Sequence, residues 1–143
     1  MKNKTTITAA LAGLAHFIGP AQLSVLRSNC RGEEGAYFKT MLIELFDRIV
    51  AMPSTYEQDG LGEKAVVNLH YFTGGCDWYI TEKDKGAAKD ATPGEQNQAF
   101  GSANLGYGAE LGYISLAEIT AAGAEIDLHF APRTLAECVK EAA

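Results

Sequence analysis

Cysteine is scarce in this chain of 143 residues, and its three copies stand far apart at Cys30, Cys76 and Cys138. An odd number without any C-x-x-C pair argues against a disulfide framework and against a structural zinc site. Long apolar runs are also missing, and none approaches the roughly 20 residues that a membrane-spanning helix needs. We therefore expect a cytoplasmic protein that has no membrane contact, no metal and no cofactor.

Positive charge is in short supply as well. Twelve lysines and arginines stand against eighteen acidic residues, which gives a net charge of −6. Residues 1–64 carry seven charges of each sign, so residues 65–143 hold the whole excess, with five basic and eleven acidic side chains. Because an acidic surface repels phosphate, this balance argues against direct binding of nucleic acid.

The glycine-rich stretch over residues 99–119, AFGSANLGYGAELGYISLAEI, lacks the spacing of a nucleotide-binding loop. Gly106, Gly108 and Gly112 follow the pattern G-x-G-x-x-x-G, whereas a dinucleotide fingerprint needs G-x-G-x-x-G at the start of a helix. The residues after Gly112 are strand-like instead. We predict that these glycines serve the backbone, by a positive φ in a hairpin turn or by close approach of strands.

Apolar spacing predicts helices in the first third of the chain. Steps of three and four residues over 5–18 place one apolar stripe on a helix, and Gly19 and Pro20 end it. A short helix over 20–29 follows, since proline suits a first helical turn. A longer stripe over 36–52 predicts a third helix.

From residue 65 onward the apolar period changes to alternation. The segments AVVNLHYF (65–72) and WYIT (78–81) predict a hairpin, and QAFGSANL (98–105) with AELGYI (109–114) predicts a second pair of strands. The polar residues 82–97 between them are predicted to form a long surface loop.

Two units, over 108–119 and 123–138, each begin with G-A-E and continue with a short strand and S/T-L-A-E. Ser115 with Glu118 and Thr134 with Glu137 have the spacing of a capping box, so each unit is typical of a strand followed by a helix start. A duplication and a coincidence of common residues both explain the similarity. Together the patterns predict one α+β domain over 1–143: a helical part over 1–53 packs on a mostly antiparallel sheet of four to five strands, with short C-terminal helices.

Catalytic motifs are missing, and no catalytic residue can be assigned. His70 in NLHYF and His129 in DLHF occupy similar strand settings, and Asp127 lies two residues before His129. If the strands are neighbours, these three side chains could share one face and bind a ligand or transfer protons. Two histidines lack the further ligands that a metal site requires. Hydrogen bonding within the sheet is the simpler role for such histidines.

Aromatic residues beside acidic ones are the other candidate feature. Trp78 and Tyr79 alternate on one strand, so we expect one of them in the core and the other exposed. Glu82 and Asp84 precede lysines and are expected to be solvated. Exposed aromatic and acidic side chains suit a protein-binding patch, although aromatic packing across strands explains the same residues. The candidate residues are Trp78, Tyr79, Glu82, Asp84, Tyr107, Glu110 and Tyr113.

Four motifs in a fixed order carry a family resemblance. W-x-I-T-E, Q-A-F-G-x-A-x-L-G, E-L-G-Y-I-S-L-x-E-I and G-A-E-x-D-L lie within residues 65–138. This module resembles an uncharacterised domain family carried by conjugative plasmids, integrative elements and phages. The resemblance carries over no catalytic residues. It implies an accessory gene of mobile DNA, often near antirestriction and other conflict genes, and a bacterial host cytoplasm.

Three functions remain open at this point. The first is a non-enzymatic accessory protein that binds a host protein, such as a defence nuclease or its complex, as an anti-CRISPR or antirestriction inhibitor. The second is a small enzyme or ligand-binding protein that uses His70, Asp127 and His129. The third is a nucleic-acid-handling factor for plasmid transfer. Its basic cluster would be Lys2, Lys4, Arg27 and Arg31.

Overall fold

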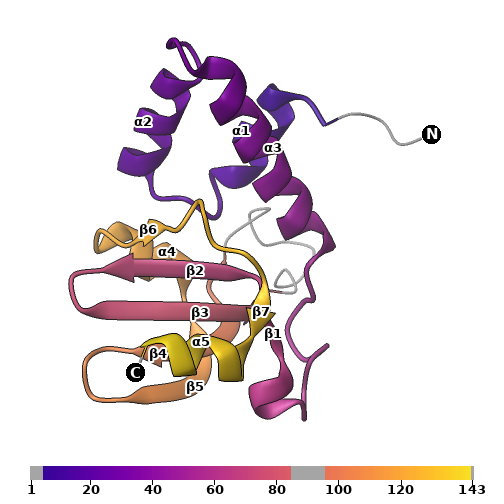
Figure 1. Ribbon diagram of the computed structural model, residues 1–143, viewed down its shortest axis with the longest axis vertical. Helices are drawn as coiled ribbons and strands as arrows, with labels where there is room; N and C mark the ends of the chain where they lie inside the picture. Colours follow the sequence, from indigo (N-terminus) through magenta and orange to yellow (C-terminus); the bar gives the residue numbers. More distant parts are fainter. Residues whose placement is uncertain (1–4, 85–95, 143) are drawn as a thin grey trace.

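The computed structural model describes residues 5–84 and 96–142 and shows an α+β protein (Figure 1). Most of the predicted loop over 82–97 lies outside the described residues. Three helices come first, in the predicted helical part of the chain, but the first ends at Leu14 with Ala15 as its C-cap and does not run to residue 18 as predicted. They are α1 (Ile7–Leu14), α2 (Pro20–Asn29) and α3 (Gly35–Ala51).

An antiparallel sheet of five strands follows in the order β5-β4-β3-β2-β6. Its strands are β2 (Leu69–Thr73), β3 (Cys76–Glu82), β4 (Ala99–Asn104), β5 (Ala109–Ile114) and β6 (Glu125–Ile126). A second, two-stranded sheet pairs β1 (Val66–Val67) with β7 (Arg133–Thr134). The short helices are η1 (Gly62–Lys64), α4 (Leu116–Ala121) and α5 (Leu135–Ala142).

The N-terminal helices pack on one face of the large sheet. Leu14 and Leu42 belong to the same buried cluster as Leu69 and Ile80 of the strands. Tyr71 is fully buried, and its hydroxyl donates to the carbonyl of Phe17 at 2.5 Å. This packing confirms the predicted contact between the helical third and the sheet.

The opposite face of the sheet is covered too. The end of the chain crosses it, so α5 lies in front of the strands in Figure 1. Phe130, Leu135 and Cys138 form a second buried cluster there with Tyr79. Tyr79 and Trp78 are therefore both buried, each 9% exposed, and the prediction that one of them lies on the surface is wrong.

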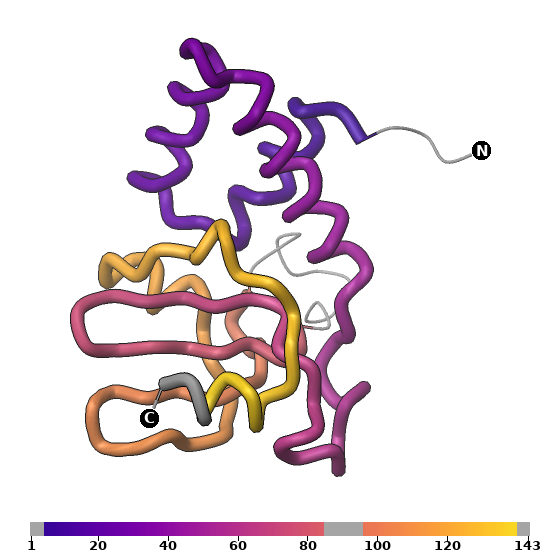
Figure 2. The backbone as a smooth tube through the Cα atoms, viewed as in Figure 1, coloured from indigo at the N-terminus to yellow at the C-terminus, as the bar shows by residue number. Residues whose placement is uncertain are grey.

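The predicted strand over 65–72 is divided at Asn68. Its side-chain amide donates to the carbonyl oxygens of Val66 at 3.3 Å and Thr81 at 3.4 Å. Before Asn68, Val66 and Val67 lie outside the large sheet and pair with Thr134 and Arg133. The tube in Figure 2 shows how this early segment meets the yellow C-terminal part of the chain.

The glycines of the β4–β5 hairpin serve the backbone, as predicted. Gly106 and Gly108 have φ angles of 101° and 106° in the turn, where a side chain would be strained. Gly101 allows close approach instead, because a Cβ there would lie 2.0 Å from the carbonyl oxygen of Tyr79. Both structural roles are thus filled within one hairpin.

Candidate functional site

Apolar side chains remain exposed along the β4–β5 hairpin. Within the described residues, β5 is an outer strand of the sheet. Its side chains alternate, so that Ile114 is buried in the core while Leu111 and Tyr113 stay outside. We call five residues the hairpin surface, with exposed fractions between 53% and 96%: Tyr56, Leu105, Tyr107, Leu111 and Tyr113.

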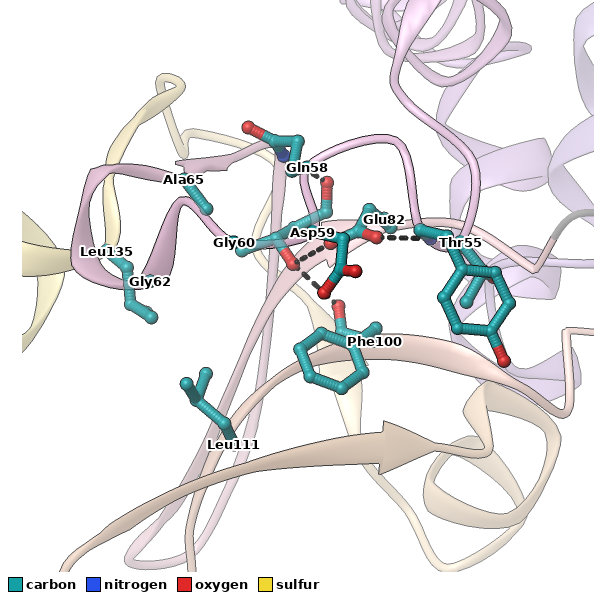
Figure 3. A pocket seen from close by; sticks show the side chains of 12 residues that line it. Thr55, Gln58, Asp59, Gly60, Gly62, Ala65, Glu82, Phe100, Leu111 and Leu135 are labelled. Carbon is teal, nitrogen blue, oxygen red and sulfur yellow. Dashed lines mark hydrogen bonds between the residues drawn. The ribbon is translucent and has the colours of Figure 1, made fainter.

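A cavity of about 350 Å³ opens beside this surface. Its walls come from residues 55–65, from strands β3, β4 and β5, and from the start of α5. Figure 3 shows Glu82 and Thr55 toward one end and Leu111 and Leu135 toward the other. The lining residues are Thr55, Tyr56, Gln58, Asp59, Gly60, Gly62, Ala65, Thr81, Glu82, Phe100, Leu111 and Leu135.

The cavity has an exposed rim and a buried floor. Tyr56, Asp59 and Leu111 are exposed and stand at the rim. Glu82 and Leu135, which are only 4% and 3% exposed, belong to the floor. A ligand entering at the rim therefore meets a carboxylate at the bottom of one end and apolar carbon at the other.

Glu82 is the most unusual lining residue, because its carboxylate is buried. One oxygen accepts the backbone N–H of Tyr56 at 2.6 Å, and the other accepts the Thr81 hydroxyl at 3.0 Å. No lysine or arginine of residues 5–84 and 96–139 forms an ion pair with it. The neighbouring Lys83 points elsewhere and donates to the carbonyls of Ile49 and Val50.

Asp84 is also buried, at 8% exposure. Its carboxylate accepts the backbone N–H of Gln98 at 3.1 Å, and its own N–H donates to the Gln96 side chain at 2.7 Å. These bonds join the segment after β3 to the residues that precede β4. The expectation that Glu82 and Asp84 are solvated is therefore wrong, and neither side chain belongs to an exposed patch.

Tyr56 holds the strained backbone position of the site. Among the described residues it alone combines a side chain with a positive φ, at 78°. This conformation is sparsely populated for non-glycine residues and is often found at functional sites. Its hydroxyl contacts that of Tyr113. The hydrogen bond to Tyr56, desolvation and the charges of Tyr56, Asp59 and Glu82 together raise the pKa of Tyr113.

The structure brings together part of the predicted histidine site. His70 contacts Asp127 at 3.1 Å through Nδ1 and Asp77 at 2.8 Å through Nε2, and it stacks on Tyr79. His129 is exposed, and only its backbone N–H reaches Asp127, at 3.0 Å. Because both ring nitrogens of His70 face carboxylates, this side chain joins β2, β3 and the segment after β6. The described residues contain no group of three or more side chains suited to a metal ion.

Sequence patterns missed every lining residue of the cavity except Glu82, and one partner of His70. Tyr56 and Phe100 line the cavity, and Asp77 is the second partner of His70. The segment PSTYEQDG around Tyr56 is rich in turn-forming residues, a composition that is typical of a loop and carries no signal of a site. Of the predicted protein-binding residues, Tyr107 and Glu110 are exposed. Of the predicted basic cluster, Lys2 and Lys4 lie outside the described residues.

Comparison of the chain with protein-family models, with curated proteins and with solved structures gives no match. None of the helices within residues 5–84 and 96–142 has both the length and the apolar character needed to cross a bilayer.

Proposed function

We propose that this protein is a non-enzymatic accessory protein that acts by binding another protein through the hairpin surface. The observation that carries the proposal is the exposure of Tyr107 at 96%, together with Leu111 and Tyr113 at more than half, on one outer hairpin. Exposed apolar patches mark interaction sites, and tyrosine is enriched at protein interfaces.

The charge around this surface favours a basic partner. Glu57, Asp59 and Glu63 are exposed in the segment 55–65 that lines the cavity, against Lys64, and Glu110 is exposed on the other face of β5. Opposite charge accelerates encounter and excludes wrong partners. A nuclease carries a basic face for its nucleic acid, so a host defence nuclease or its complex has the required chemistry.

The resemblance of residues 65–138 to a family of mobile DNA supplies the biological setting. In that setting the protein inhibits a host defence such as restriction or CRISPR interference, in the bacterial cytoplasm. Enzymatic use of His70 is less well supported, because both of its ring nitrogens already contact carboxylates.

The test compares two exposed tyrosines. Tyr107→Ser removes the most exposed side chain of the hairpin surface, in the turn between β4 and β5, whereas Tyr37→Ser changes a tyrosine that is 54% exposed on α3. Cells with and without a restriction or CRISPR system express each variant and are challenged with phage or plasmid. We expect the wild type and Tyr37→Ser to protect the incoming phage or plasmid from the host defence. Tyr107→Ser should lose this protection. Equal results for the two variants, or no protection in any defence background, would contradict the proposal.

A further inference from the structure

We propose that the cavity beside the hairpin surface binds an arginine side chain that the partner protein inserts. This inference rests on the proposed function, because the partner supplies the arginine. The proposed function does not say which group of the partner enters the cavity lined by Tyr56, Glu82 and Leu111, and this inference identifies that group.

The charge of the ligand follows from Glu82. A buried carboxylate is unfavourable unless hydrogen bonds and an opposite charge compensate it. Each of its oxygens accepts one hydrogen bond, from Tyr56 and from Thr81, and each can accept one more. No lysine or arginine of the described residues within 5–139 pairs with it, so the carboxylate is open to a positive group that enters the cavity. Asp59 at the rim adds a second negative charge on the way in.

The shape of the ligand follows from the rest of the lining. Leu111, Ala65 and Leu135 offer apolar contact to a methylene chain, and the Phe100 ring lies near Glu82 in Figure 3. A guanidinium group pairs with a carboxylate through two parallel bonds and stacks on aromatic faces, whereas an ammonium group does neither as well. An arginine side chain has both the apolar stem and the planar cation, and a cavity of about 350 Å³ holds it.

The first experiment uses small probes of equal shape. Ethylguanidinium is titrated into the labelled protein, and N-ethylurea, its uncharged analogue, serves as the comparison. Binding is followed by NMR at the Tyr56 amide, which donates to Glu82, and at the Leu111 and Leu135 methyl groups. A second comparison compound, butylammonium, carries the same charge on an ammonium group. We expect ethylguanidinium to bind at least tenfold more tightly than either ethylurea or butylammonium. Equal binding of either comparison compound would overturn the assignment to arginine.

Three variants test the residues. Glu82→Gln keeps the size of the side chain and removes its charge, and we expect at least a tenfold loss of ethylguanidinium affinity. Glu125→Gln removes the same charge from an exposed position on β6 and should bind as the wild type does. Because a buried substitution can unfold the chain, Leu111→Trp, at a position 54% exposed, fills the cavity from its rim instead. Retained binding in Leu111→Trp would overturn the proposal.

The outcomes separate this inference from the proposed function. If Tyr107→Ser abolishes protection but ethylguanidinium does not bind, the hairpin surface acts without the cavity and the inference fails alone. If ethylguanidinium binds through Glu82 but no variant affects protection, the proposed function fails, and an arginine from a partner fails with it. Both results together, protection through Tyr107 and selective binding through Glu82, support the inference.

Discussion

Gly101 and Gly112 face each other in the β4–β5 pair, yet a methyl group would meet different surroundings at each. At Gly101 an added Cβ lies 2.0 Å from the backbone oxygen of Tyr79, and at Gly112 nothing lies within 4 Å. Because backbone of a central strand cannot move aside cheaply, we expect Gly101→Ala to lower the free energy of unfolding by about 3 kcal/mol. Gly112→Ala should be neutral within about 1 kcal/mol. Urea unfolding of both variants measures this, and similar values would contradict the explanation.

A buried tyrosine makes stability depend on alkaline pH. Burial raises the pKa of Tyr71 above its ordinary value of 10.0. In the unfolded chain Tyr71 loses its proton near pH 10, while the folded protein keeps it, so its contribution to stability is complete below pH 10 and is lost as pH rises further. One proton corresponds to about 1.4 kcal/mol per pH unit.

The variant Tyr71→Phe isolates this effect. It leaves the Phe17 carbonyl without its donor, so we expect a loss of about 1–2 kcal/mol at pH 7. Above pH 10 the wild type should lose stability more steeply than the variant. The difference in free energy of unfolding between the two should therefore narrow. Chemical unfolding at pH 7, 10 and 11 measures it. A gap that stays constant over this range would show that Tyr71 ionises equally in both states.

At the scale of elements, the two predicted capping boxes differ in completeness. At the start of α5, Thr134 donates through its backbone N–H and its hydroxyl to Glu137, and Glu137 returns its N–H at 3.3 Å. At the start of α4, Ser115 receives the N–H of Glu118 at 3.1 Å, and its hydroxyl donates to Asn97. The capping box at α5 therefore includes the bonds to the glutamate carboxylate, whereas at α4 the serine hydroxyl binds Asn97 instead.

This difference predicts a different response to acid. The hydrogen bonds from Thr134 lower the pKa of Glu137, so the stability that this carboxylate contributes is present above about pH 4.5 and is lost as pH falls through its folded value. We expect Thr134→Ala to cost about 1 kcal/mol at pH 7 and less at pH 3. Ser115→Ala should cost the same at both pH values. Urea unfolding of the two variants at each pH checks this, and an unchanged Thr134→Ala effect at pH 3 would contradict it.

Local patterns predicted the elements well where punctuation residues mark them. Helix α2 begins at Pro20, as the sequence indicated, because a fixed φ and a missing N–H suit that position. Gly19, predicted to end the first helix, is instead the N-cap of α2. The strand over 65–72 was predicted too long, because alternation continues through Asn68. The division at Asn68 depends on distant segments, because β1 pairs with β7 from the end of the chain while β2 pairs with β3 and β6.

The candidate site was less predictable, because its features depend on distant segments. Tyr79 is buried by Phe130 and Leu135, which return across the sheet from the end of the chain. Glu82 looked solvated because lysines follow it, yet the segment around Tyr56 covers it. Burial of this kind is a property of tertiary packing and has no local pattern in the sequence.

On the scale of the whole molecule, polar side chains tie the helical layer to the rest of the fold. Arg48 of α3 donates to the carbonyl of Phe130 at 2.9 Å, and Lys83 of the segment after β3 donates to the carbonyls at the end of α3. Lys83 thereby satisfies backbone groups that every helix end leaves unpaired. Since helix and sheet also share one core cluster, these bonds fix the position of a layer that apolar packing already holds.

The third of these ties, Gln22 of α2, closes an edge of the sheet. Its amide donates to the Ile126 carbonyl at 3.0 Å, and its oxygen accepts the Ile126 N–H at 2.9 Å, as a neighbouring strand would. Ile126 is 2% exposed, so Gln22→Ala leaves two buried backbone groups unpaired, and we expect a loss of about 2 kcal/mol. Ser24→Ala, on the exposed side of the same helix, should change stability by less than about 0.5 kcal/mol. Hydrogen exchange at the Ile126 amide should accelerate only in Gln22→Ala, and equal exchange in both variants would mean that β6 is held by its pairing with β2 alone.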